Sequence, residues 1–346
     1  MESKQGASLK KREVYLDALR VTATLAVMVI HLAATGYAEA VPGSYEWTVC
    51  LIYSTLARFA VPAFVMISGA MHLDPGREVA MKHMLKKTGK LMTVFVCWSL
   101  VYALTESVKE HQIFSAAYAL AVVHRLVSGH YHMWYLYTIA GLYLATPFLR
   151  AMAADENLLK MYIVTAFALN FCLRIPTWIP GWEETAGTAF NHADAGIFAG
   201  FTGYYCLGCY LHRRTFTKKQ IAVISLFSGL LMAAFLVAGI LLDRPAMAFS
   251  EKMPQIFLYG AGVFLLFKSS AGHLERRRGI LEKVVPCTFG MYLIHPAFNF
   301  LFRKTGLYAL TFDPLFCIPL CALLVFGASF SVVWCMRKIP LLRKLT

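Results

Sequence analysis

Long, uninterrupted apolar runs limit the folds open to this chain more than any other feature of its sequence. The run from Ile221 to Leu242 exceeds the roughly 18 to 20 residues that a helix needs to cross about 30 Å of hydrocarbon. Backbone N–H and C=O groups find no water in a bilayer, so a spanning run must be helical unless the chain closes into a barrel. Barrel strands alternate with period two, and these runs do not. The sequence therefore predicts an all-α, polytopic integral membrane helix bundle.

About ten segments are apolar enough to be candidate spans. The chain is 58% hydrophobic and only 15% charged, which leaves more apolar surface than one water-soluble core can hide. No long hydrophilic stretch or internal repeat divides it, so residues 1–346 are expected to form one transmembrane domain, with a basic cytoplasmic tail at 1–12. We expect spans at 14–35, 48–71, 91–107, 133–149, 158–175, 197–212, 220–242, 254–270, 284–302 and 315–335.

The distribution of charge predicts the orientation. The chain carries 33 Lys and Arg against 19 Asp and Glu, a formal net charge of +14. If the amino terminus is inside, 24 of the 33 basic residues fall in the tail and the cytoplasmic loops. The positive-inside rule then places both termini in the cytoplasm. Because topology accounts for most of the charge, we expect membrane lipid as a partner and no nucleic acid. The first apolar run lacks a cleavage pattern, so we expect it to remain as a span.

Two polar residues, Arg20 and His31, lie inside the first predicted span. At 100° per residue, their separation brings them within about 20° of the same helix face, about 16 Å apart along the axis. A charge inside a span is expected to face the bundle interior or a water-filled cavity. Arg20 alone would also suit a side chain that reaches the cytoplasmic headgroups and pairs with Asp17. His31 lies too deep for that, and is either an interhelical hydrogen bonder or a functional residue.

Further imidazoles lie toward the same outer half of the membrane. The segment GHYHMWYLY places His130 and His132 at the outer end of one span, and MYLIHPAF places His295 in the outer half of another. These positions lack the i, i+4 pair or nearby carboxylates that support zinc on a helix, so we expect no metal. Cys206 and Cys209 form a CxxC in an apolar run, for which helix packing is favoured over a metal or redox role.

Four lysines form the densest basic cluster at a span entrance. They are Lys82, Lys86, Lys87 and Lys90. Such a cluster either follows the topology rule and touches anionic lipid, or forms a phosphate-binding mouth for a nucleotide-like cofactor. No Walker motif, nucleophile elbow or dinucleotide fingerprint accompanies it. The residues alone leave both interpretations open.

Six short motifs follow one another along nearly the whole chain. They read LDALRVTATLAVMVIH, RFAVPAFVMISGAMHL, KKTGKLMTVFVCWSL, HMWYLYTIAGLYLATPFLR, FTGYYCLGCYL and CTFGMYLIHP, and the first holds an Arg and a His separated by ten residues. In this order they resemble the acyltransferase-3 family, membrane O-acyltransferases that modify bacterial surface glycans. Each motif alone is weak, whereas the six together are specific for the family but not for a substrate.

The resemblance implies an acyl-CoA-dependent acyltransferase in the bacterial cytoplasmic membrane. It implies acetyl-CoA as the donor and a hydroxyl of a cell-surface or lipid-linked glycan as the acceptor. His31 is then expected to act as general base or to carry the acyl group transiently, and Arg20 to hold the donor or stabilise the oxyanion. The donor phosphates are expected at the four lysines, and the glycan at His132, Trp134, Tyr292 and His295.

A transporter or flippase without chemistry is the alternative. A polar face across a helix bundle serves the permeation of a small polar molecule or glycolipid as well as it serves catalysis. Succinyl or another acyl donor, and an amino acceptor, also stay open, because nothing in the sequence measures the size of the acyl pocket. The sequence makes no prediction of oligomeric state.

Overall fold

The computed structural model describes residues 13–74, 80–110, 115–179, 181–192, 200–251 and 253–346. Side chains at 108–110, 170–174 and 190–191 are also left out. The predicted basic tail at 1–12 thus lies outside the described residues. The described residues are almost entirely helical and contain no strand, which confirms the all-α fold class.

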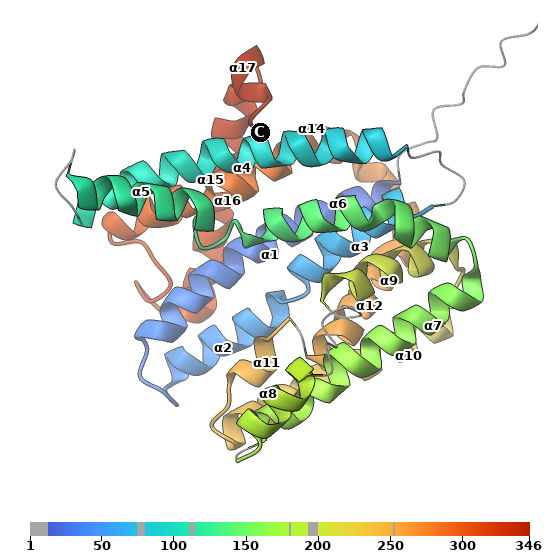
Figure 1. The fold of residues 1–346 in the computed structure, drawn as a ribbon. Helices are drawn as coiled ribbons and strands as arrows, with labels where there is room; N and C mark the ends of the chain where they lie inside the picture. The colour runs from blue at the N-terminus through green and yellow to red at the C-terminus, as the bar shows by residue number, and fades with distance from the viewer. Residues whose placement is uncertain (1–12, 75–79, 111–114, 180, 193–199, 252) are drawn as a thin grey trace, which may run out of the picture.

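The helices are joined mostly by short turns (Figure 1). In chain order they are α1 (Val14–Glu39), α2 (Tyr45–Ala57), α3 (Ala60–His72), α4 (Met81–Glu110), α5 (Ala116–Ser128), α6 (Trp134–Ala153), α7 (Glu156–Ala166), η1 (Phe167–Phe171), η2 (Cys172–Trp178), α8 (Glu183–His192), α9 (Phe201–Arg213), α10 (Lys218–Leu241), α11 (Ala246–Phe249), α12 (Pro254–Ser269), α13 (Ala271–Leu274), η4 (Glu275–Arg277), α14 (Arg278–Val284), η5 (Val285–Cys287), α15 (Thr288–Lys304), α16 (Pro314–Met336) and α17 (Pro340–Arg343).

Six helical stretches among the described residues are long and apolar enough to cross a membrane. They are Val14–Glu39, Tyr45–His72, Met81–Ser107, Lys218–Leu241, Ala271–Lys304 and Pro314–Met336. The other four predicted spans fall on α6, on α7 with η1 and η2, on α9 and on α12, which are not among these six. The chain is therefore a multi-pass membrane protein, and the larger total of about ten spans stays a prediction.

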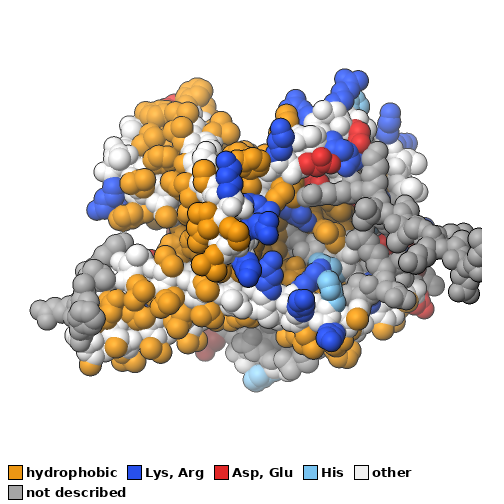
Figure 2. Space-filling view, turned by 90° about the horizontal axis from the view of Figure 1, so that it is seen from above, with side chains coloured by type: hydrophobic (Ala, Val, Ile, Leu, Met, Phe, Trp, Pro, Cys, Tyr) orange, Lys and Arg blue, Asp and Glu red, His pale blue; other side chains and the backbone are white. Residues whose placement is uncertain are grey.

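The outer helices expose large apolar side chains. Leu226 on α10 and Phe316 on α16 are each 66% exposed, although water would disfavour them. Figure 2 shows hydrophobic side chains over one side of a face of the molecule, whereas Lys and Arg side chains gather near its middle and its other side, beside a hollow. Apolar surface of this extent suits a lipid environment.

Helix α1 lies at the centre of the bundle. It packs against α2, α3, α12, α15 and α16, and most of its residues are buried (Figure 1). Polar side chains on α1 therefore face other helices, as the sequence predicts for charged groups inside a span. This position lets α1 contribute to cavities at both of its ends.

Two glycines allow α3 and α9 to touch through their backbones. A Cβ atom at Gly69 would lie 1.8 Å from the Tyr205 carbonyl oxygen, and one at Gly208 would lie 2.1 Å from the Met66 carbonyl oxygen. Small residues at a crossing permit such close approach of membrane helices. Cys206 and Cys209 flank Gly208 as buried free thiols, in keeping with the packing interpretation of the CxxC.

The second span is broken near its middle, where α2 ends and α3 begins. Pro62 lies in the first turn of α3, where its missing N–H costs no helical hydrogen bond. Arg58 sits at the break, and its Nη1 donates to Glu251 Oε1 at 2.8 Å, before α12. Arg58 falls inside the predicted span 48–71, and this ion pair explains how a charge is accommodated there.

Candidate active site

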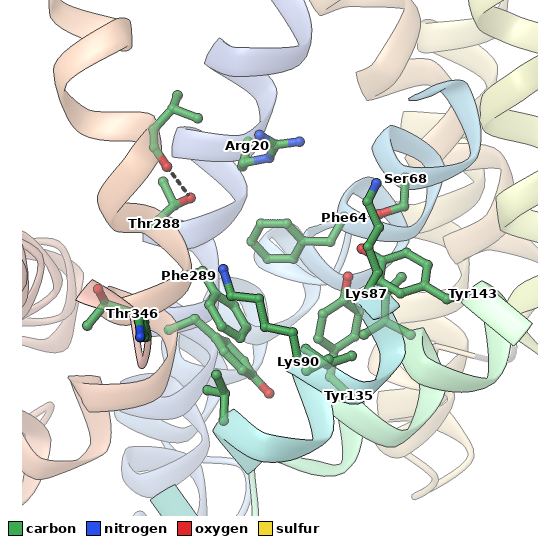
Figure 3. A pocket seen from close by; sticks show the side chains of 16 residues that line it. Arg20, Phe64, Ser68, Lys87, Lys90, Tyr135, Tyr143, Thr288, Phe289 and Thr346 are labelled. Carbon is green, nitrogen blue, oxygen red and sulfur yellow. Dashed lines mark hydrogen bonds between the residues drawn. The ribbon is translucent and has the colours of Figure 1, made fainter. Parts of the chain in front are cut away.

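A cavity of about 400 Å³ lies between α1, α3, α4, α6 and α15 (Figure 3). We call it the inner cavity, and the one at the other end of α1 the outer cavity, after the orientation that the sequence predicts. Cationic side chains contribute to its lining, and aromatic and aliphatic side chains form much of its wall. No Asp or Glu side chain lines it among the described residues. The lining residues are Arg20, Phe64, Ser68, Lys87, Lys90, Leu91, Val94, Tyr135, Ile139, Tyr143, Val285, Thr288, Phe289, Tyr292, Lys344 and Thr346.

The cations of the inner cavity come from different elements. Arg20 of α1 donates from Nη2 to Met71 Sδ at 3.3 Å, so the guanidinium lies beside the end of α3. Lys87 of α4 lies with Nζ 2.8 Å from His72 Nε2. Figure 3 shows the side chains of Arg20, Lys87 and Lys90 around one space. Positive charges along an otherwise apolar cavity suit a ligand with an anionic end and a less polar arm.

Only two of the four predicted lysines belong to this cavity. Lys87 and Lys90 line it, whereas Lys82 and Lys86, nearer the start of α4, are exposed and line neither of the cavities described here. The sequence pattern indicated a basic cluster, but it did not indicate which members turn inward.

Other basic residues near helix ends bind backbone carbonyl groups. Arg150 Nη1 donates to the carbonyls of His72 and Asp74, each at 2.8 Å, beyond the end of α3. Lys268 Nζ donates to the carbonyls of Leu211 and His212 at 2.8 and 2.7 Å at the end of α9. The last carbonyls of a helix lack intrahelical partners and carry partial negative charge. These cations therefore have a structural role in addition to any topological one.

An outer cavity of about 490 Å³ lies at the other end of α1. Its lining differs from that of the inner cavity in holding a carboxylate, Glu106, and two imidazoles, His31 and His130. Asn299 Oδ1 in this lining is buried without a hydrogen-bond partner in the described structure. The lining residues are His31, Leu32, Thr35, Tyr102, Thr105, Glu106, His130, Tyr131, Pro296, Ala297, Asn299, Phe300, Arg303, Tyr308 and Ala309.

The two cavities share no lining residue, and a series of contacting rings, Tyr292, His132 and His295, leads from the lining of one to that of the other. We call these three rings the wall. Tyr292 lines the inner cavity, and its ring centroid lies 5.3 Å from that of His132. The His132 and His295 centroids are also 5.3 Å apart. On the outer side, His295 stacks on His31 with a centroid distance of 5.1 Å and an interplanar angle of 28°.

The His295 imidazole is held in one tautomer by its own helix. Its Nδ1 lies 2.7 Å from the Tyr292 carbonyl oxygen, which can only accept, so Nδ1 carries the proton. In the neutral ring Nε2 then has a free lone pair, and this atom is buried without a partner among the described residues. An imidazole nitrogen of this kind can accept a proton from a neighbouring group.

The predicted site residues thus divide into two groups. Arg20 lies at the inner cavity, whereas His31 lies at the outer cavity with His132 and His295 close by. Trp134 lines neither cavity. Trp134 is 39% exposed, and its ring centroid lies 5.5 Å from that of Phe201 on α9.

Several cavity residues were not singled out from the sequence. In the inner cavity these are Ser68, Tyr135 and Tyr143, and in the outer cavity Tyr102 and Glu106. Apolar neighbours surround the tyrosines in the sequence, so no local pattern distinguished them from packing residues. Within the described part of the chain, no group of three or more His, Cys, Asp or Glu side chains is arranged to hold a metal ion.

Comparison with known proteins identifies relatives over most of the chain. A family model described as "Acyltransferase domain" (Acyl_transf_3) matches residues 13–336. The Bacillus subtilis (strain 168) protein named "Putative membrane-bound acyltransferase YfiQ" is 22% identical over 259 residues, which cover 71% of this chain and 69% of that protein. No solved structure matches the chain.

Proposed function

We propose, because this chain belongs to the acyltransferase-3 family, that it transfers an acetyl group from cytoplasmic acetyl-CoA to a hydroxyl of a cell-surface or lipid-linked glycan. The family makes the chain an acyltransferase. The observation that carries it is the pair of chemically different cavities, at opposite ends of α1, with imidazoles between them.

The inner cavity suits an acyl-CoA donor. Lys87, Lys90 and Arg20 provide positive charge for phosphate groups, and Phe64 and Phe289 provide an apolar surface for the extended arm. In this arrangement the thioester end points toward Tyr292, where the wall begins. Arg20 holds the donor, because it lies on the donor side of the wall.

The outer cavity suits a glycan. Tyr131 and Tyr308 present aromatic faces for a sugar ring, and the buried Asn299 Oδ1 can accept a hydrogen bond from a sugar hydroxyl. Such a cavity excludes much of the surrounding lipid while it orients the acceptor. Of the residues that the sequence assigned to the glycan, His132, Tyr292 and His295 lie in the wall, whereas the position of Trp134 favours a packing role.

His31 acts as the general base in this proposal. It lines the acceptor cavity and not the donor cavity, which favours proton removal from the hydroxyl over transient attachment of the acyl group. As the hydroxyl oxygen bonds to the thioester carbonyl carbon, its proton passes to His31. The C–S bond then breaks, the ester remains outside, and the CoA thiolate takes up a proton on the inner side. The acyl group reaches the outer cavity past the Tyr292 ring.

The direct test uses membranes that contain the full chain, labelled acetyl-CoA and the glycans of the host cell. We expect His31→Ala and Arg20→Ala to abolish labelled ester while the membrane level of the protein stays normal. As a matched control, Lys86→Ala removes a charge that lines neither cavity and should keep wild-type activity. Full activity of either site variant would remove that residue from the mechanism.

We also propose that the protein crosses a bacterial inner membrane ten times. Both termini then lie in the cytoplasm, and the whole chain acts as one domain. In support, α6, α9 and α12 lie alongside the apolar spans in Figure 1. Reporter fusions at the α8 segment and at the α13 to α14 segment test the topology. We expect the first reporter outside and the second inside, and the reverse result would overturn the orientation.

Transport without chemistry remains the second candidate, because two cavities on opposite sides of a thin wall also suit alternating access. The labelled-donor experiment separates the two functions. A labelled glycan supports acyl transfer. Label that stays on CoA while the glycan still crosses the bilayer supports transport.

A further inference from the structure

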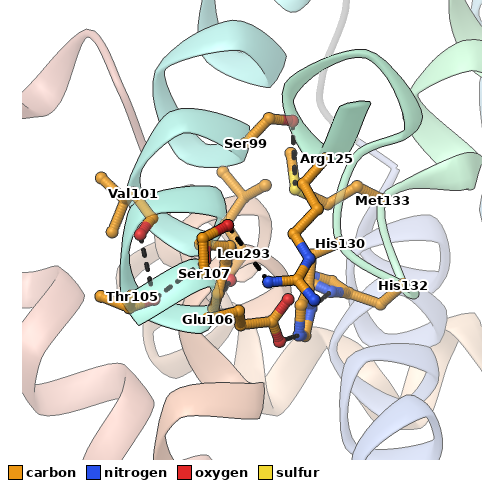
Figure 4. A network of polar contacts seen from close by, with 11 residues as sticks. Ser99, Val101, Thr105, Glu106, Ser107, Arg125, His130, His132, Met133 and Leu293 are labelled. Atoms are coloured by element: carbon orange, nitrogen blue, oxygen red, sulfur yellow. Dashed lines mark hydrogen bonds and ion pairs between the residues drawn. The ribbon is translucent and has the colours of Figure 1, made fainter. Parts of the chain in front are cut away.

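A chain of three acid–base side chains leads from the wall to the outer cavity (Figure 4). Glu106 of α4 accepts from His130, with 3.1 Å between Oε1 and Nε2. The Nδ1 atoms of His130 and His132 are 2.7 Å apart and share one hydrogen bond. Acyl transfer as described above uses neither Glu106 nor His130.

The hydrogen bonds of this chain can reverse together. A carboxylate only accepts, so His130 Nε2 carries a proton while Glu106 is ionised. With His130 neutral, His132 Nδ1 donates to His130 and His132 Nε2 has a free lone pair. With His130 cationic, its Nδ1 donates to His132 instead, and the proton of His132 lies on Nε2. Uptake of one proton at His132 Nε2 converts the first state into the second, and His130 can then pass its Nε2 proton to Glu106, so a proton that enters at one end leaves from the other.

Glu106 and His132, at the two ends of this series of side chains, lie in different surroundings. Glu106 lines the outer cavity, and its side chain is 37% exposed. His132 Nε2 is buried without a partner among the described residues, and its ring contacts His295, which stacks on His31. Glu106 is therefore accessible to solvent, and His132 lies close to the proposed base, His31.

Neighbouring groups hold the imidazoles in place. The Tyr102 ring stacks on His130 at 4.2 Å and 14°, and the Tyr102 hydroxyl donates to the Leu293 carbonyl at 2.7 Å. The Tyr292 hydroxyl donates to the backbone carbonyl of His132. Rings fixed by α4 and α15 keep the hydrogen-bonded order during a proton transfer.

We propose that Glu106, His130 and His132 form a proton relay that carries the hydroxyl proton from the imidazole cluster to the outer aqueous phase. This inference rests on the proposed function. A bound glycan would displace water from around His31, so the base needs another route by which to lose its proton. Within the imidazole cluster the rings are in contact without a hydrogen bond in the described structure, so His295 Nε2 takes the proton from His31 and gives it to His132 Nε2 through small ring movements. From His132 the proton follows the hydrogen-bonded links to His130 and Glu106, and then passes to water. Each ester formed therefore releases one proton outside, and the thiolate takes up one inside.

The charged and titratable groups around the relay come from several elements. They are His31 of α1, Arg58 at the break between α2 and α3, Tyr102 of α4, Arg125 of α5, Tyr131, and Tyr292 and His295 of α15. Arg125 donates to Ser107 Oγ at 3.2 Å beside Glu106. Removing the Glu106 carboxylate leaves these groups in place, so the substitution tests the relay with little other change.

The experiment uses right-side-out membrane vesicles loaded with labelled acetyl-CoA, with the endogenous glycans as acceptor. Ester formation is measured against external pH for the wild type, Glu106→Gln, Glu106→Asp and the exposed outer control Glu184→Gln. We expect Glu106→Gln to lower the rate at least tenfold and to flatten its dependence on external pH. Glu106→Asp should retain that dependence at a lower rate, and Glu184→Gln should match the wild type.

A purely structural role of Glu106 would lower the rate equally at every pH. A Glu106→Gln profile that superimposes on the wild-type profile after scaling therefore overturns the relay. If the wild type forms no ester, the proposed function fails, and infrared titration of the full chain in liposomes then tests the relay. We expect the Glu106 carboxyl band to shift its titration in His132→Asn, two links away, and an unchanged titration would overturn the relay.

Discussion

Lys90→Ala and Lys86→Ala form a matched pair that tests whether the inner cavity binds an anionic donor. Both lysines are exposed on α4, one helical turn apart, and each substitution removes one positive charge from the same side of the protein. Of these two lysines, only Lys90 lines the inner cavity. A specific phosphate contact should therefore depend on Lys90 alone, whereas attraction by the general positive field should depend on both.

The exposure of Lys90 limits the size of the effect. Two unit charges 4 Å apart attract by about 1 kcal/mol in water and by about 4 kcal/mol at an effective dielectric constant of 20. Lys90 is exposed, so the lower value is the better guide, and ordering a lysine side chain offsets part of any larger gain. A net loss of about 1 kcal/mol corresponds to an increase of about fivefold in KM for the donor.

The assay is the initial rate of labelled ester formation against acetyl-CoA concentration at about 0.1 M and about 1 M salt. The Debye length falls from about 10 Å to about 3 Å over this range, so the difference between Lys90→Ala and the wild type should shrink at high salt. The value of kcat should change little, because Lys90 is assigned to the donor phosphates and not to the reacting groups. Equal increases in KM for both variants, or no increase in either, would refute the assignment of the cavity to the donor phosphates.

Three further substitutions test other parts of the structure. His295→Asn can keep the hydrogen bond to the Tyr292 carbonyl but removes the Nε2 lone pair; we expect kcat to fall by about 10²-fold or more at a normal membrane level, and activity within threefold of the wild type would exclude the imidazole from proton transfer. Gly208→Ala would overpack the crossing of α3 and α9 and should destabilise the bundle by about 1–3 kcal/mol, whereas Gly141→Ala, with nothing within 4 Å, should not; equal melting temperatures in detergent would contradict this. Arg150→Ala leaves the carbonyls at the end of α3 without their donor, so the free energy of unfolding, measured by thermal unfolding in detergent, should fall by about 1–3 kcal/mol while kcat of the folded fraction is unchanged.

The features that depend on local sequence were predictable. Apolar runs indicated the helices, because only a regular helix satisfies its own backbone in lipid. The helical repeat placed Arg20 and His31 on one face of α1, and both residues do line cavities. The repeat could not indicate that these cavities are separate. That separation depends on rings from α15 and from the turn before α6, and nothing in the sequence of α1 reports which helices lie beside it.

The contact between Glu106 and His130 is a second example of an arrangement that the local sequence cannot predict. In the sequence, Glu106 precedes α5 and His130 follows it. The polypeptide returns to α4 through a turn at Gly129, where φ is +73°. A glycine accepts that backbone angle readily, but its presence does not reveal the direction of the returning chain. Likewise, the hydrogen bonds of Arg150 to the carbonyls of His72 and Asp74 require the folded arrangement of two distant segments, which no local pattern around Arg150 reports.

The wall of Tyr292, His132 and His295 has a consequence for the cell as well as for the reaction. A bacterium that exports a chemical group through a protein must avoid a leak that would dissipate its ion gradients. Under the proposed function, the rings between the two cavities would have to keep ions and CoA on their own sides, while an acetyl group would pass by displacement of a ring. The proposed function thus makes the same three side chains responsible for permeability and for catalysis, and it predicts that a substitution that enlarged the gap between them would be harmful even if it accelerated transfer.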